Sequence, residues 1–113
     1  MQGATEKGAS RLIEDAKTLE GLGAFSLVLE CVSRTVGSRV SSHLSIPVIG
    51  IGAGADVDGQ VLVVSDVLGL TRGRTPRFVR KYLDGEALVS KAFEEFFRQV
   101  DEAEYPNESE AYD

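Results

Sequence analysis

Three short apolar runs restrict the folds open to this chain more than any other feature of its sequence. They are AFSLVL at 24–29, VIGI at 48–51 and QVLVV at 60–64. Apolar residues recur at helical spacing in the segments 5–20 and 33–44, which precede the first and second runs. Short uncharged runs that alternate with helices are typical of parallel strands joined by right-handed crossovers. We therefore expect an α/β fold with about three parallel strands, either in an open doubly wound sheet or in part of a (β/α) barrel.

The rest of the chain predicts two helices and an acidic tail. Residues 78–83 suggest a short helix, and residues 88–100 a longer one with a wide apolar stripe. We expect residues 1–104 to form one domain and residues 105–113 to be disordered. Six of the 18 acidic residues lie at 101–113 without a base, and the other 12 balance the 12 Lys and Arg, so the net charge of −6 belongs to this end. Its repulsion of phosphate argues against nucleic acid as a partner.

Cysteine content and hydropathy indicate the compartment. The single cysteine, Cys31, excludes an intramolecular disulfide and suits a reducing environment. No apolar run approaches the length of a membrane span, and the first residues lack a secretory pattern. We therefore expect a soluble cytoplasmic protein that does not bind membranes.

Glu30 is the candidate catalytic residue. It stands directly after the first apolar run, where a parallel strand ends, and ligands bind at the carboxyl ends of strands in both barrels and doubly wound sheets. A carboxylate among apolar neighbours loses solvation and gains affinity for protons, which suits a general base. The alternative is a surface glutamate paired with an arginine.

The glycine-rich stretch GIGAGADVDG at 50–59 fits a dinucleotide-binding fingerprint only in part. Gly50, Gly52 and Ala55 have the spacing, but the following residues continue a loop where the motif requires a helix. A tight turn that lets the backbone approach a small ligand accounts for these glycines better. Nucleotide binding by a small α/β domain is a further alternative.

The other polar residues are weaker candidates. Cys31 has no partnered base and His43 has no acid or cysteine at ligand spacing, so both are expected to be structural or exposed. Asp56, Asp58 and Asp66 lack the spacing of a calcium loop. A basic cluster is expected to be a solvated face, although it could meet an anionic substrate group or a neighbouring subunit. Its members are Arg72, Arg74, Arg77, Arg80 and Lys81.

Three longer strings are more specific than these motifs. LVLECV, IPVIGIGAGADVDGQVLVVSDVLGL and PRFVRKY resemble the C-terminal half of ketopantoate hydroxymethyltransferases, and the likeness runs from Gln2 to Pro106. The resemblance implies the C-terminal part of a (β/α)₈ barrel and a cytoplasmic homo-oligomer. It also implies transfer of a hydroxymethyl group from 5,10-methylenetetrahydrofolate to 3-methyl-2-oxobutanoate, with Mg²⁺ bound to the keto acid. The proton-accepting glutamate of the family maps onto Glu30.

The chain departs from the family pattern at two positions and in length. Ser65 stands where the family usually has histidine, and Ser33 where it commonly has proline. Barrels of this class need about 250 residues, and three strands cannot close a barrel. The family's Mg²⁺ ligands and keto-acid contacts lie in its N-terminal half. We therefore expect no metal ligand in this chain and no transferase activity from it alone.

Several explanations of such a chain are open on sequence alone. It could be a gene fragment, the product of a mis-called start codon, or one half of a split enzyme that pairs with a separate N-terminal half. A non-catalytic half-barrel that serves as a binding or interaction module is the alternative to an enzyme. Co-expression with an N-terminal half distinguishes the two classes, because only the enzyme regains activity.

Overall fold

The computed structural model describes residue 3 and residues 5–112, which fold as parts of two compact units. Unit 1 comprises Met1–Val63 and Arg77–Val79, and unit 2 comprises Val64–Pro76 and Arg80–Asp113. Among the described residues, every member of the buried apolar core belongs to unit 1. Membership of residues 1–104 in a larger barrel domain stays a prediction.

The first helix of unit 1 forms where the sequence supplies a cap and an apolar face. α1 (Glu6–Gly21) begins after Thr5, whose hydroxyl oxygen accepts a hydrogen bond from the Gly8 N–H at 3.1 Å. The helix lies within one residue of the predicted segment 5–20. Three small or branched apolar residues on one face are buried, namely Ala9, Ile13 and Ala16.

The second helix, α2 (Arg34–His43), also has the predicted start. The Ser33 hydroxyl oxygen accepts a hydrogen bond from the Val36 N–H at 3.3 Å, which satisfies one of the free donors of the first turn. The helix ends four residues before Pro47, because Leu44 already has extended backbone angles. Its buried face contains Val36, Gly37 and Val40.

Three parallel strands form an open sheet in the order β1–β2–β3. They are β1 (Leu27–Glu30), β2 (Val48–Ile51) and β3 (Gly59–Gln60). A sequential order is what a barrel requires, whereas a doubly wound sheet reverses its order at a switch point. The predicted α/β class with three parallel strands and flanking helices is confirmed.

The third strand is much shorter than the apolar run from Gln60 to Val64 predicted. One further ladder bond, from the Val61 N–H to the Gly50 carbonyl oxygen at 3.0 Å, extends the pairing beyond β3. The neighbouring strand then ends, because Gly52 has a φ of +69° and turns the backbone away. Within the part of the chain that the structure describes, the residues after Val61 therefore have no strand beside them with which to pair.

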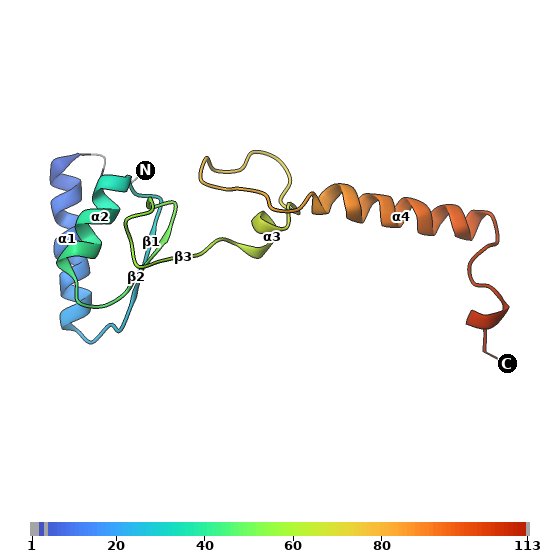
Figure 1. The fold of residues 1–113 in the computed structure, drawn as a ribbon, viewed down its shortest axis with the longest axis horizontal. Helices are drawn as coiled ribbons and strands as arrows, with labels where there is room; N and C mark the ends of the chain where they lie inside the picture. Colours follow the sequence, from blue (N-terminus) through green and yellow to red (C-terminus); the bar gives the residue numbers. More distant parts are fainter. Residues whose placement is uncertain (1–2, 4, 113) are drawn as a thin grey trace. The chain divides into compact units, whose positions relative to one another are not determined.

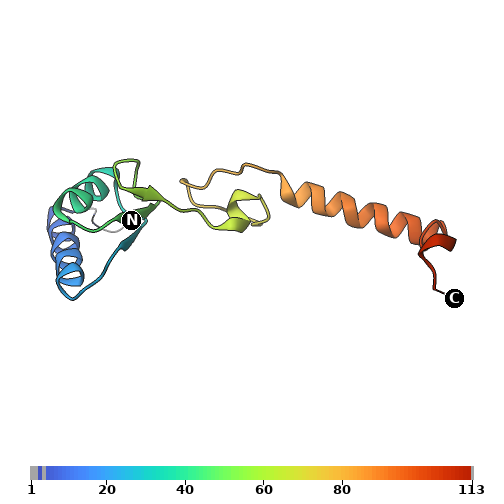
Figure 2. The same ribbon diagram turned by 60° about the horizontal axis from the view of Figure 1, so that its bottom comes forward.

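The two helices cover one face of this sheet. Figures 1 and 2 both show α1 and α2 on the same side of the strands. Leu27 and Leu29 of β1 pack against the core cluster below these helices. Val28 and Glu30 alternate with them and are exposed, Val28 to 67%. In the described part of unit 1, the face that bears Val28 and Glu30 has no helix over it.

The connection between β2 and β3 contains no helix. β2 ends at Ile51 and β3 begins at Gly59, so only the seven residues from Gly52 to Asp58 join two parallel strands. Such crossovers usually need a dozen or more residues. Here the loop packs directly on α2, because the buried Ala53 lies against Gly37, where a Cβ atom would overlap the Ala53 carbonyl oxygen.

Unit 2 contains α3 (Val64–Val67), α4 (Gly85–Asp101) and a 3₁₀ turn, Glu108–Glu110. α4 agrees with the long helix predicted at 88–100, whereas the short helix predicted at 78–83 is absent. The Tyr82 N–H instead donates to the Val67 carbonyl oxygen at 2.9 Å, so part of this segment bonds to α3 rather than to itself. The 3₁₀ turn is exposed and lies in the segment predicted to be disordered.

An apolar stripe on α4 is exposed along its whole length. Two pairs of aromatic rings within it are in contact, Phe93 with Phe97 and Phe96 with Phe97, and Phe96 also meets Tyr105 edge-on at 5.5 Å between centroids. The exposed members are Leu88, Val89, Phe93, Phe96, Phe97 and Val100. No helix among the described residues is long and apolar enough to cross a membrane.

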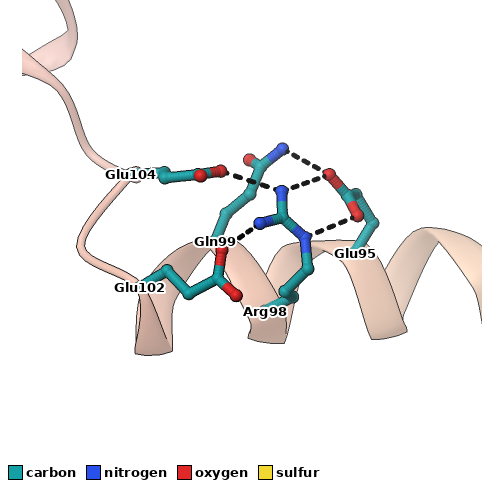
Figure 3. Close-up of polar contacts among 5 residues, drawn as sticks. All are labelled: Glu95, Arg98, Gln99, Glu102 and Glu104. Atoms are coloured by element: carbon teal, nitrogen blue, oxygen red, sulfur yellow. Dashed lines mark hydrogen bonds and ion pairs between the residues drawn. The ribbon is translucent and has the colours of Figure 1, made fainter.

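Arg98 gathers three carboxylates at the end of α4 (Figure 3). It donates two hydrogen bonds to Glu95 at 2.8 and 3.0 Å and one to Glu104 at 2.8 Å, and it also pairs with Glu102. Hydrogen bonds from Arg98 and then Gln99 lower the pKa of Glu95 to about 2. The hydrogen bonds that Arg98 donates to Glu95 and then to Glu104 raise the pKa of Arg98.

Candidate functional site

The carboxyl end of β1 places Glu30 as the sequence predicts. Glu30 pairs in register with Ile51, and the next residue, Cys31, donates its N–H to the Ile51 carbonyl oxygen at 3.0 Å. The side chain of Glu30 shares the helix-free face with Val28. Within the described residues it forms no ion pair with an arginine. The carboxylate is therefore free to meet a ligand at this edge of the sheet.

A glycine turn follows β2 next to Glu30, and Phe78 packs on it. A Cβ atom built on Gly52 would lie 2.8 Å from Cε1 and 2.9 Å from Cγ of the Phe78 ring, which is closer than any side chain tolerates. Gly52 also has a positive φ. The predicted tight turn is present, and the ring of Phe78 approaches its backbone; approach of a small ligand stays a prediction. Sequence reasoning missed Phe78 as part of this edge, because it assigned the residue to a helix.

The carboxylates of the loop have structural partners. Asp56 accepts a hydrogen bond from Nε of Arg34 at 2.8 Å, and this bond, with the charge of Arg34, holds the pKa of Asp56 below its ordinary value. Asp58 accepts from the Val48 N–H at 2.8 Å and from the Ser41 hydroxyl at 3.2 Å. Both side chains hold the short crossover in place, so they serve the turn and not a ligand.

Of the remaining candidates, His43 and Cys31 belong to unit 1, and Asp66 and Arg72 to unit 2. His43 is exposed on α2, with Nδ1 2.6 Å from the Arg39 carbonyl oxygen, so a hydrogen bond there requires a proton on Nδ1. Cys31 is half-buried with a φ of +55°. Asp66 accepts a hydrogen bond from the Thr71 hydroxyl at 2.6 Å within unit 2. Of the basic cluster, Arg72 pairs with Glu86 at 2.9 Å, also within unit 2.

The described residues do not fit a Mg²⁺ site. Residue 3 and residues 5–112 contain no group of three His, Cys, Asp or Glu side chains that could hold a metal ion. Mg²⁺ demands near-octahedral oxygen ligands, of which carboxylates supply at least one or two. The two carboxylates within the loop, Asp56 and Asp58, are already engaged.

Comparison with known proteins identifies relatives over nearly the whole chain. A model of the ketopantoate hydroxymethyltransferase family matches residues 1–108. A 3-methyl-2-oxobutanoate hydroxymethyltransferase of Wolinella succinogenes is 48% identical over 99% of the chain, and that of Phocaeicola vulgatus is 49% identical over 95%. The enzyme of the same name from Francisella tularensis is 42% identical over the full chain.

These matches cover only part of each relative. The chain spans 43% of the length of the Wolinella and Francisella proteins and 39% of that of Phocaeicola. A part of a (β/α)₈ barrel that covers this share of its length would contain about three parallel strands with flanking helices in an open sheet, as this chain does. On the family match and on these identities, the chain belongs to the ketopantoate hydroxymethyltransferase family.

Proposed function

We propose that this chain supplies the proton-accepting edge of a 3-methyl-2-oxobutanoate hydroxymethyltransferase. The reaction transfers a hydroxymethyl group from 5,10-methylenetetrahydrofolate to 3-methyl-2-oxobutanoate and gives 2-dehydropantoate, a precursor of pantothenate. The family match supports the reaction, and the position of Glu30 supports the role of this chain in it. In our proposal the protein is cytoplasmic and assembles as a homo-oligomer, and residues outside this chain hold Mg²⁺ and most of the keto acid.

The chemistry assigned to Glu30 is removal of the single proton on C3 of the keto acid. The carbonyl next to C3 accepts the electron pair of the broken C–H bond, which leaves an enolate. C3 of the enolate then forms a bond to the one-carbon unit of the folate. That carbon leaves N5 and N10, water supplies its hydroxyl group, and the two nitrogens take up the proton removed from C3 and one proton of the water. Glu30 suits this step because it stands at the carboxyl end of β1, on the helix-free face. Barrel enzymes place their catalytic groups at that end of the strands.

Deuterium exchange at C3 tests the proposal without the folate. We combine the 113-residue chain with a polypeptide that covers the part of the Wolinella succinogenes relative outside the matched region. In D₂O, exchange is followed by NMR. Glu30→Gln is expected to slow exchange by roughly a hundredfold or more, because it removes the general base. Glu14→Gln, an exposed residue of α1, serves as the control.

Two outcomes contradict the assignment. The first is exchange that Glu30→Gln leaves unchanged, which excludes this residue as the base. The second is folate-dependent turnover by the 113-residue chain alone, which contradicts the proposal that other residues complete the site.

A non-catalytic interaction module is the second candidate. The observation in its favour is the amount of exposed apolar surface, with Phe25 at 85% and Val28 at 67% in unit 1 and the stripe of α4 in unit 2. Surfaces of this kind mark protein contacts. A stable complex with the complementary polypeptide that shows neither exchange nor turnover supports the module.

A further inference from the structure

The segment 71–83 differs in charge from the rest of the chain. It holds five Arg or Lys residues and no acid, in a chain whose net charge is −6. The structure folds a short part of this segment, Arg77–Val79, into unit 1. This brings one aromatic ring, Phe78, and the arginine before it to the sheet that carries Glu30.

The ring of Phe78 lies close to the carboxyl end of β1, where Glu30 is found. It packs on Gly52, which directly follows Ile51, the register partner of Glu30. Neighbouring strands lie about 4.8 Å apart, and consecutive Cα atoms are 3.8 Å apart. The ring that contacts Gly52 therefore lies no more than roughly 12 Å from the Glu30 Cα atom. That interval is the size of a bound organic molecule.

The side chains at this position suit an aromatic anion. Phe78 is only half-buried, so part of its ring is open to a ligand, and Arg77 is exposed. Among the described residues, Arg77 forms no ion pair. Aromatic rings stack on planar ligands, and a guanidinium group binds a carboxylate through two parallel hydrogen bonds.

We propose that Phe78 and Arg77 form part of the binding site for the folate co-substrate. The reacting methylene carbon bridges N5 and N10, so folate rings flank the carbon that must meet the enolate beside Glu30. Phe78 provides the stacking surface for those rings, and Arg77 pairs with a carboxylate of the glutamyl tail. This inference rests on the proposed function, because it takes the folate as the one-carbon donor.

Isothermal titration with 5-formyltetrahydrofolate, a folate that does not transfer its carbon here, measures the site directly. The 113-residue chain is titrated alone and in combination with the complementary polypeptide described above. Phe78→Ala is expected to raise the dissociation constant roughly tenfold, since aromatic stacking is worth that much. Phe78→Tyr keeps the ring and is expected to bind as the unmodified chain does.

Arg77→Gln provides a second variant that leaves the packing on Gly52 intact. We expect it to weaken binding of the folate and to leave binding of tetrahydropterin, which has no glutamyl tail, unchanged. Tyr112→Ala and Arg11→Gln are matched controls, because both side chains are exposed and neither lies in the segment at the glycine turn. Circular dichroism confirms that each variant is folded before titration.

The outcomes separate this inference from the proposed function. The inference is overturned if the folate does not bind, or if Phe78→Ala, Arg77→Gln and the controls bind it equally. This holds even where C3 exchange depends on Glu30. Folate binding that depends on both residues supports the inference even where no C3 exchange occurs, and in that case only the assignment of Glu30 fails.

Discussion

Gly37 shows how one missing side chain permits the connection between β2 and β3. It lies in the buried face of α2, where a Cβ atom would overlap the carbonyl oxygen of Ala53. The backbone of the loop therefore lies directly on the helix. A glycine inside a helix lowers helix propensity by about 1 kcal/mol relative to alanine. The close approach explains why glycine occupies this position all the same.

Gly37→Ala is expected to destabilise the chain although it improves helix propensity. Forcing a methyl group against the Ala53 carbonyl costs about 1–3 kcal/mol as overpacking, which exceeds the propensity gain. Urea unfolding followed by circular dichroism measures the change. Gly21→Ala is the control, because nothing lies within 4 Å of a Cβ atom there, and it is expected to be neutral or stabilising. Equal stability of both variants contradicts the close approach.

The candidate site could be predicted from sequence only where it depends on local pattern. Glu30 directly follows an apolar run, and parallel strands carry functional groups at that end, so its position follows from the pattern alone. The contact between Phe78 and Gly52 joins residues 26 positions apart in the chain. No local spacing encodes such a contact, and the periodicity of 78–83 even favoured a helix.

At the scale of single elements, the end of α4 depends on electrostatics. Arg98 holds Glu95 of α4 together with Glu102 at the C-cap and Glu104 of the chain that follows (Figure 3). Cations near a helix C-terminus also stabilise its free carbonyl groups. Because the pKa of Glu95 is lowered, this end binds fewer protons when it is ordered than when it is frayed.

Acid is therefore expected to fray the end of α4. The stability that the Arg98–Glu95 contact supplies is complete above the ordinary glutamate pKa of 4.5 and is lost as the pH falls towards about 2. Carbon-13 chemical shifts of residues 98–101 in the full chain report the loss of helix. In Arg98→Met the transition is expected to disappear, because those residues are already frayed at neutral pH. Helical shifts that persist to pH 2 would contradict the expectation, and Arg11→Met on α1 is the control.

The elements that could be predicted best are those with a complete local signal. Thr5 and Ser33 cap α1 and α2, and the apolar periodicity of each helix defined its buried face. The predicted third strand has an apolar pattern throughout but pairs with β2 only at its start, since Gly52 ends β2 early. Strand length is a property of the pair, so a single run cannot reveal it.

At the scale of the whole molecule, the two units differ in how much apolar surface they bury. All eight residues of the core cluster belong to unit 1, with Val40 and Val48 the most deeply buried. Among the described residues of unit 2, the only buried positions are Gly69 and Gly85. A helix of 17 residues without tertiary packing is marginally stable in water. The units should therefore open independently.

Hydrogen exchange measured residue by residue tests this difference. Amides of Val40 and Val48 are expected to exchange at least about a hundredfold more slowly than amides in the middle of α4, since a buried core sets the highest opening free energy. Addition of the complementary polypeptide is expected to slow exchange in α4 if it covers the apolar stripe. Equal protection of the two units in the chain alone contradicts the division.

The helix-free crossover also bears on the order in which the strands pair during folding. Ile49 meets Gly59 across ten positions of the chain, whereas Leu27 meets Val48 across 21. By the logarithmic dependence of loop-closure entropy on length, the shorter interval is favoured by about 0.7 kcal/mol. The shortest strand, β3, thus belongs to the strand pair whose formation loses the least chain entropy.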